Sequence, residues 1–249
     1  MYSLPFLIFL FSSSQVIYLL DRMLLSDPAD SINVPERVEY AIQNQNKGKA
    51  FLGINFLLVL ITVFYLNIEV LLFFGFLTFL TGIYLFFLRV LPVSEVIRAL
   101  AKPVLLGIVW GLIITASVFL FYIPEKLDSI PMDLVIYASL LFFLNGWYFD
   151  KRDARGDRKS GKPNIQNFIS ESIHRWVIFL VPSFILILNF YFYNFSIIQY
   201  LSFYFLILSV LPHHSKFFSY QFSYNVLIDL PILLIPAIDL MITMSRSFL

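Results

Sequence analysis

Long apolar runs recur along this chain, and they constrain its fold more than any other feature. Several reach the 18 or more residues with which a helix spans the hydrocarbon core of a bilayer. Only 13% of the residues are charged, against about 25% in a typical soluble domain. The sequence therefore predicts an all-α fold, a polytopic transmembrane bundle of about eight helices that forms one domain over residues 1–249. The runs cover approximately 3–20, 50–66, 70–88, 103–122, 132–149, 173–193, 197–211 and 222–244.

The basic residues are distributed unevenly among the connections between these runs. Four polar connections, at 21–49, 89–102, 150–175 and 212–221, hold 15 of the 17 Lys and Arg residues. Because short loops rich in Lys and Arg stay in the cytoplasm, we expect all four on the cytoplasmic side of a bacterial inner membrane. The expected surroundings are the lipid bilayer and no nucleic acid, since the basic loops have no fold suited to binding it. The same bias means that topology alone can explain much of the basic charge.

One polar stretch, residues 145–164, follows an apolar run directly and carries three regularly spaced carboxylates. Asp150, Asp153 and Asp157 would fall within about 60° of one another if the preceding helix continued through them. Such a cluster is tolerable when a divalent cation neutralises it, and Mg²⁺ typically binds one or two carboxylates together with substrate phosphates. The interleaved Lys and Arg residues would supply donors for those phosphates. Spacing alone also permits a charged loop at the membrane surface.

The first polar connection repeats this pattern in a weaker form. A helix again ends at a carboxylate, Asp21, and Asp27 and Asp30 follow it. Pro28 prevents a regular helix through all three positions, so Asp21 is the best candidate ligand here. Two acidic helix ends on the same side of the membrane can hold a diphosphate between them through Mg²⁺.

These motifs resemble those of the UbiA-type intramembrane prenyltransferases. The pattern D-x-x-D-x-x-x-D-R-x-x-G of the family's second aspartate-rich motif is matched from Asp150 to Gly161, with Arg158 at its arginine. The tail of the first motif, D-x-x-N-x-P-x-R, is similar to the segment from Asp30 to Arg37. The segment KPVLLGIVWGL, which begins at Lys102, resembles the stretch after the family's fourth helix. The resemblance covers essentially the whole chain in helix order.

The resemblance implies a transferase that moves an isoprenoid chain from its diphosphate to a lipophilic, often aromatic, acceptor with Mg²⁺ as cofactor. The implied catalytic residues are Asp150, Asp153 and Asp157, which would hold the metal together with Asp21. The implied diphosphate-binding residues are Lys102, Arg37, Arg158 and Lys159. The ring faces of Tyr18, Trp147 or Tyr148 would stabilise an allylic cation, although an ordinary aromatic belt at the membrane interface explains these residues as well.

Two other functions are compatible with the sequence. In one alignment Ile17 and Tyr18 occupy the Asn and Asp positions of the first motif, and family members usually have nine helices. A catalytically degenerate protein of the same fold, acting as a lipid-binding or scaffold component, is therefore the main alternative. A transporter is a third, based on Asp229 and Asp239 in the last apolar run. We also expect Glu171 and His174, three residues apart, to form a pair on a helix surface.

Overall fold

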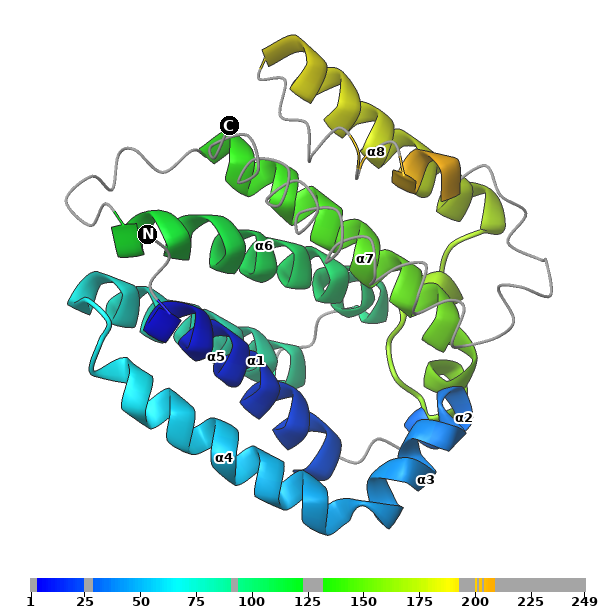
Figure 1. Ribbon diagram of the computed structural model, residues 1–249. Coiled ribbons are helices and arrows are strands. Elements are labelled where there is room, and N and C mark those ends of the chain that lie inside the picture. The colour runs from blue at the N-terminus through cyan, green and yellow to red at the C-terminus, as the bar shows by residue number, and fades with distance from the viewer. Residues whose placement is uncertain are drawn as a thin grey trace. The chain divides into compact units, whose positions relative to one another are not determined.

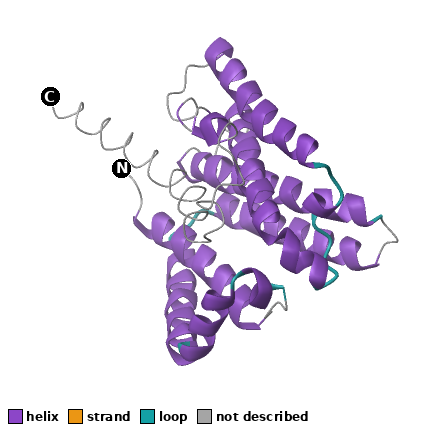
Figure 2. Ribbon diagram, turned by 90° about the vertical axis from the view of Figure 1, so that its right-hand side faces the viewer, coloured by secondary structure: helices purple, strands orange, loops and turns teal. Residues whose placement is uncertain are grey.

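The computed structural model describes residues 4–24, 29–90, 94–122, 132–192, 200, 202 and 204–208 (Figure 1). Within this part of the chain the regular structure is entirely helical, as Figure 2 shows by colour. The helices are α1 (Leu4–Leu24), α2 (Asp30–Asn33), α3 (Pro35–Gln43), α4 (Gln45–Val63), α5 (Ile68–Val90), α6 (Glu95–Tyr122), α7 (Met132–Lys159) and α8 (Glu171–Phe192), with a short 3-10 turn at Ile165–Asn167.

Six of the predicted runs coincide with long helices, namely α1, α4, α5, α6, α7 and α8. Residues 200, 202 and 204–208 of the seventh run are helical, whereas the eighth run, with Asp229 and Asp239, lies outside the described residues. By length and composition, four of the described helices are able to cross a membrane, α4, α6, α7 and α8. The all-helical architecture is confirmed for the described residues, and these four helices indicate a membrane protein.

Two helices begin or end differently from the prediction. The sequence places Pro103 in the first turn of a helix, but α6 begins at Glu95 and Pro103 lies inside it. Ser94 explains the earlier start, because its hydroxyl accepts a hydrogen bond from the Ile97 N–H at 3.4 Å, as at a helix N-cap. At the other end, α7 does not end at Phe149 but continues through the charged stretch to Lys159.

The described helices contribute to two compact units, and the first combines residues 1–98, 113–131 and 153–163. In this unit α1 packs along α4 (Figure 1). Phe6 stacks on Phe121 with ring centroids 4.4 Å apart. The Asn67 side-chain amide, at the turn between α4 and α5, donates to the Leu120 carbonyl at 3.0 Å. These contacts join the N-terminal helices of the unit to the C-terminal part of α6.

The second unit combines residues 99–112, 132–152 and 164–249. In it α6 and α7 approach closely at glycines. A Cβ on Gly107 would lie 2.5 Å from the Ser139 carbonyl oxygen, and one on Gly111 would overlap the Ser139 side chain. Gly107 and Gly111 form a G-x-x-x-G pair, the spacing that lets two membrane helices pack backbone to backbone. This contact fixes the part of α6 that carries Lys102 against the last turns of the apolar part of α7.

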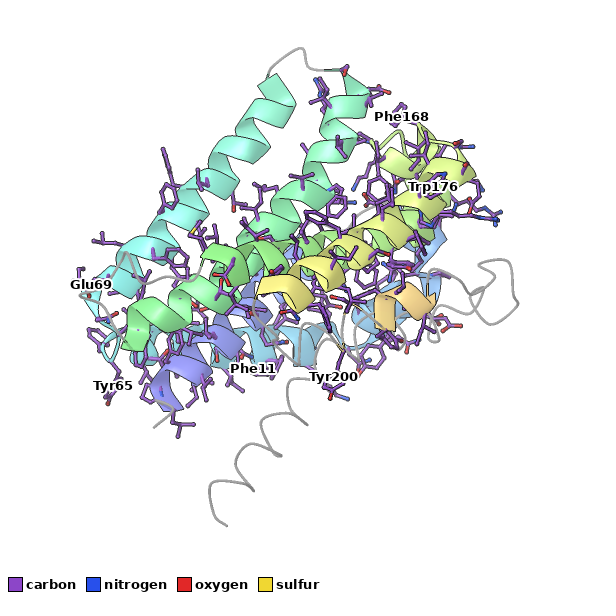
Figure 3. The ribbon with its side chains drawn as sticks, turned by 90° about the horizontal axis from the view of Figure 1, so that it is seen from above. Phe11, Tyr65, Glu69, Phe168, Trp176 and Tyr200 are labelled. Carbon is purple, nitrogen blue, oxygen red and sulfur yellow. The ribbon has the colours of Figure 1, made fainter. Side chains whose placement is uncertain are left out.

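Exposed aromatic side chains gather where α8 begins in the second unit. Trp176 is 58% exposed and Phe168, in the preceding turn, is 42% exposed. Figure 3 shows both side chains at this end of α8. Because Trp and other aromatic residues concentrate at the border between lipid and water, they indicate that the connection between α7 and α8 lies near a membrane surface.

Candidate functional site

The carboxylate motif lies on the last turns of α7, which form one uninterrupted helix (Figure 1). The helix ends in a Schellman motif. The Gly161 N–H donates to the Arg158 carbonyl at 3.4 Å, and the Lys162 N–H donates to the Asp157 carbonyl at 2.8 Å. Gly161 has φ of +70°, a left-handed conformation that favours glycine. The glycine that closes the D-R-x-x-G pattern therefore has a local structural role, because it ends the motif-bearing helix.

The three carboxylates share one face of α7, as the spacing predicts. At about 100° of rotation per residue, Asp150, Asp153 and Asp157 fall within about 60° of one another. Asp150 is 2% exposed and Asp157 is 6% exposed, while Asp153 is partly buried. Burial of charged carboxylates is costly unless cations or hydrogen-bond donors accompany them. The surroundings of this face are therefore informative about its function.

Asp150 has a cationic partner in the second unit. The Lys102 ammonium lies 2.8 Å from the Asp150 carboxylate, and the Lys102 side chain is 50% exposed. The close packing of α6 on α7 supports this pair, because Gly146, one turn before Asp150, lies against Pro103, the neighbour of Lys102. Of the basic residues predicted to bind a diphosphate, Lys102 is the one that the described contacts bring to a motif carboxylate.

Asn164 holds the backbone of α7 at the same position. Its amide N–H donates to the Asp150 carbonyl oxygen at 2.8 Å, and its amide oxygen accepts from the Gln166 N–H at 2.9 Å. Asn164 is completely buried. The chain thus folds back after the motif and binds the residue with which the motif begins.

A second asparagine, Asn33, holds α7 three residues further on, in the first unit. The Asn33 amide N–H donates to the Asp153 carbonyl at 3.0 Å, and the Gly156 N–H donates to the Asn33 amide oxygen at 2.8 Å. Asn33 ends α2 and belongs to the D-x-x-N-x-P-x-R segment. The tail of the first acidic segment therefore binds the second motif directly.

Gly156 makes this approach possible. A Cβ at this position would overlap the side-chain amide of Asn33. No role was predicted for Gly156 or Asn164, nor for the pair Gly107 and Gly111. The G-x-x-x-G spacing was a detectable signal for the pair, and the D-x-x-N-x-P-x-R segment included Asn33, whereas Asn164 had no comparable signal.

Of the other residues predicted to bind metal or diphosphate, two are exposed on α7 and two have side chains outside the described residues. Arg158 and Lys159 are exposed, and each lies about 100° or more around α7 from Asp157. The side chains of Asp21 and Arg37 lie outside the described residues, so their expected roles stay predictions. The geometry therefore favours Lys102 over Lys159 for contact with a ligand on the carboxylate face.

The prediction of a helix-surface pair is wrong for His174, which is buried, although its charge acts on Glu171 three residues away. His174 is 1% exposed and accepts a hydrogen bond on Nδ1 from the Trp147 indole N–H at 3.1 Å. Glu171 instead bonds the Lys151 ammonium. The i, i+3 spacing did not reveal that α8 turns His174 towards the core. Trp147 and Tyr148 are also core residues, with Tyr148 stacked on Phe205 at 6.0 Å, so packing accounts for their presence.

The three carboxylates of α7 are the donors that the predicted cation would require. Among the described residues, no three His, Asp or Glu side chains converge closely enough to hold a metal ion by themselves. Mg²⁺, however, commonly takes only one or two carboxylates and completes its shell with phosphate oxygens and water. Asp150, Asp153 and Asp157 could meet that requirement in the presence of a phosphorylated substrate.

Comparison with known proteins adds no assignment. No family model matches the chain, and no curated protein and no solved structure matches it. The contacts of α7 with Lys102, Asn164 and Asn33 are therefore the basis for any functional assignment.

Proposed function

We propose that this chain is a membrane prenyltransferase of the UbiA type, with about eight helices, that transfers an isoprenoid chain from its diphosphate to a lipophilic or aromatic acceptor. The observation that carries the proposal is the contact of Asn33 with α7. Two segments of the sequence resemble the two aspartate-rich motifs of that family, and a pair of hydrogen bonds joins them across 120 residues of chain. Chance resemblance of two unrelated loops would give no reason for this contact.

The buried carboxylate face supports the same proposal. Asp150 and Asp157 are buried at the end of an apolar helix, where a soluble diphosphate and a lipid tail would meet. A divalent cation bound there would neutralise the leaving diphosphate. Lys102, which is half exposed, would turn from Asp150 to the diphosphate once the cation balances the charge of that carboxylate.

The proposed reaction breaks the bond between the prenyl carbon and the diphosphate oxygen and forms a bond from that carbon to the acceptor, which releases a proton. Asp150, Asp153 and Asp157 would orient the diphosphate through the cation, and Lys102 would stabilise the charge that develops on the leaving group. Asn33 and Asn164 would act as positioning residues, because both bind backbone atoms of the helix that carries these carboxylates.

We further propose that the polar connections around residues 21–49, 89–102 and 150–175 face the cytoplasm, in a bacterial inner membrane. The basic bias of these connections supports the orientation. The exposed Trp176 next to the last of them fits a position at the membrane surface.

A second candidate is a scaffold or lipid-binding protein that retains the architecture without the chemistry. The Lys102–Asp150 ion pair favours it, because it balances the charge of this buried carboxylate in the absence of any metal. Ile17 and Tyr18, at positions where the first motif would carry Asn and Asp, are exposed apolar or aromatic side chains.

An assay in membranes that contain the full chain distinguishes the two candidates. The membranes are incubated with prenyl diphosphates of increasing length, with Mg²⁺ or with EDTA, and diphosphate release is measured. We expect release that requires Mg²⁺ and falls about 100-fold or more in Asp153→Asn. Asp133→Asn, at the opposite end of the same helix, is the matched control and should retain activity.

Each outcome bears on a different part of the proposal. Release that survives both EDTA and Asp153→Asn would contradict the role of the carboxylate face. Absence of release with every donor, together with absence of saturable diphosphate binding, would exclude the transferase and favour the scaffold.

A further inference from the structure

The end of α7 carries a second charged surface, most of it on the side away from its carboxylates. Arg155, Arg158, Lys159 and Lys162 are all exposed, and we call them the basic face. The three that lie within the helix fall within about 100° of one another, at about 100° of rotation per residue. Arg155 and Lys159 each lie about 120° or more around the helix from the three carboxylates, whereas Arg158 lies about 80° from Asp150 and about 100° from Asp157. One helix end thus separates buried negative charge from exposed positive charge.

The contact with the neighbouring α2 lies on another side of α7 than this basic face. Asn33 binds α7 at Asp153 and Gly156, on the side away from Arg155 and Arg158. Gly156 is buried under this contact, whereas its neighbour Arg155 is exposed. The basic face is therefore the solvent-exposed side of the helix end, not a surface turned into the protein.

The basic face follows the apolar part of α7 directly along the helix axis. The Arg152 guanidinium lies 4.5 Å from the centre of the Phe149 ring. Phe149 is the last residue of the apolar run, and the charged residues of α7 follow it. Lys159 lies about 10 Å further along the helix axis, at about 1.5 Å per residue. Headgroup layers occupy roughly 5–7 Å on each side of the hydrocarbon core, so in a helix that crosses the membrane cations over this length would come within reach of the headgroups.

We propose that the basic face binds the phosphates of anionic lipids in the membrane that the chain spans. Lys and Arg residues that follow a membrane-spanning helix attract anionic headgroups and contribute about a fivefold preference each. A lipid phosphate is confined to the membrane surface, where this face lies. Arg155 and Lys159 each lie about 120° or more around α7 from the three carboxylates, so a lipid phosphate bound by these two residues does not depend on the proposed transferase activity.

Native mass spectrometry of the detergent-solubilised full chain tests the proposal. Binding of phosphatidylglycerol is compared with binding of phosphatidylcholine of the same acyl chains. Wild type should prefer phosphatidylglycerol, and Arg155→Gln/Lys159→Gln should weaken its binding about 25-fold while leaving phosphatidylcholine unchanged. The control is Lys126→Gln, which removes a basic charge from the connection between α6 and α7, at the other end of α7 and outside the described residues.

A charge-preserving variant, Arg155→Lys/Lys159→Arg, should keep the preference. An unaltered fold is shown by unchanged phosphatidylcholine binding. The proposal is overturned if the Gln double variant binds phosphatidylglycerol like wild type, or if the control loses as much affinity. It is also overturned if millimolar inorganic diphosphate displaces the lipid, because the basic face would then be a site for soluble phosphates.

Discussion

Asn164 and Asn33 make the same kind of contact with α7 in different surroundings. Each donates its amide N–H to the carbonyl of a motif aspartate, Asp150 for Asn164 and Asp153 for Asn33. Asn164 is fully buried and reaches back only 14 residues along the chain. Asn33 is partly buried and bridges 120 residues. The local contact therefore secures the fold around α7, whereas the distant one secures the position of α2.

Their burial predicts different energetic roles. Loss of a buried partner leaves backbone groups without hydrogen bonds and without water, which costs about 1–3 kcal/mol for each group. At a partly buried position water replaces the lost amide, so the penalty is smaller. Three substitutions test this contrast through the free energy of unfolding.

Asn164→Ala should be the most damaging of the three. It removes the donor to the Asp150 carbonyl and the acceptor for the Gln166 N–H. We expect a loss of about 2–3 kcal/mol in the free energy of unfolding, measured by SDS titration in micelles. Asn164→Asp keeps the acceptor and lacks the donor, so it separates the two bonds. A loss below about 0.5 kcal/mol for Asn164→Ala would show that this contact is not a source of stability.

Asn33→Ala should lower the free energy of unfolding by only about 1 kcal/mol. Its clearer effect should be local, with faster amide hydrogen exchange in α2 and α3 and unchanged exchange in the apolar part of α7. Asn44→Ala is the matched control, because Asn44 makes an exposed bond to the Tyr40 carbonyl one helical turn away. Equal amide hydrogen exchange in Asn33→Ala and Asn44→Ala would show that the contact of Asn33 with α7 does not hold α2 and α3 in place.

Gly156→Ala should have the smallest effect on the free energy of unfolding. The sign of this effect should depend on whether residue 33 is asparagine or alanine. In wild type the new methyl group displaces Asn33 and breaks both of its bonds, which outweighs the gain in helix propensity. In Asn33→Ala that conflict is absent, and alanine should stabilise α7 by about 0.5–1 kcal/mol. The same SDS titrations of the two single variants and the double variant measure this coupling. Additive effects would mean that Asn33 and Gly156 do not interact.

Much of the helical architecture was predictable because the long helices correspond to apolar runs in the sequence. The runs over 50–66, 70–88 and 132–149 coincide with α4, α5 and α7 to within a few residues, apart from the extension of α7 to Lys159. The shared face of Asp150, Asp153 and Asp157 also followed from spacing, once the helix continued through them. Local periodicity is sufficient for such features, since they involve one element at a time.

The contacts around the motif were not predictable in the same way. The partner of Asp150 is Lys102, 48 residues away, and nothing in the spacing of either residue encodes the packing of α6 on α7 that joins them. Burial of His174 was missed for a related reason, because polar residues on apolar helices give no sign of the direction in which they point. Long-range hydrogen bonds depend on tertiary packing, which one sequence specifies only collectively.

The glycine contact between α6 and α7 also restricts sliding of one helix along the other. If α6 shifted by one turn, about 5.4 Å, Pro103 would take the place of Gly107 and bring a Cβ against the Ser139 carbonyl. The same shift would carry Lys102 away from the Asp150 carboxylate that it contacts at 2.8 Å. Gly107 thus works as a stop that sets the axial register, and a small residue deep in the helix pair determines the height at which a cation meets the carboxylate.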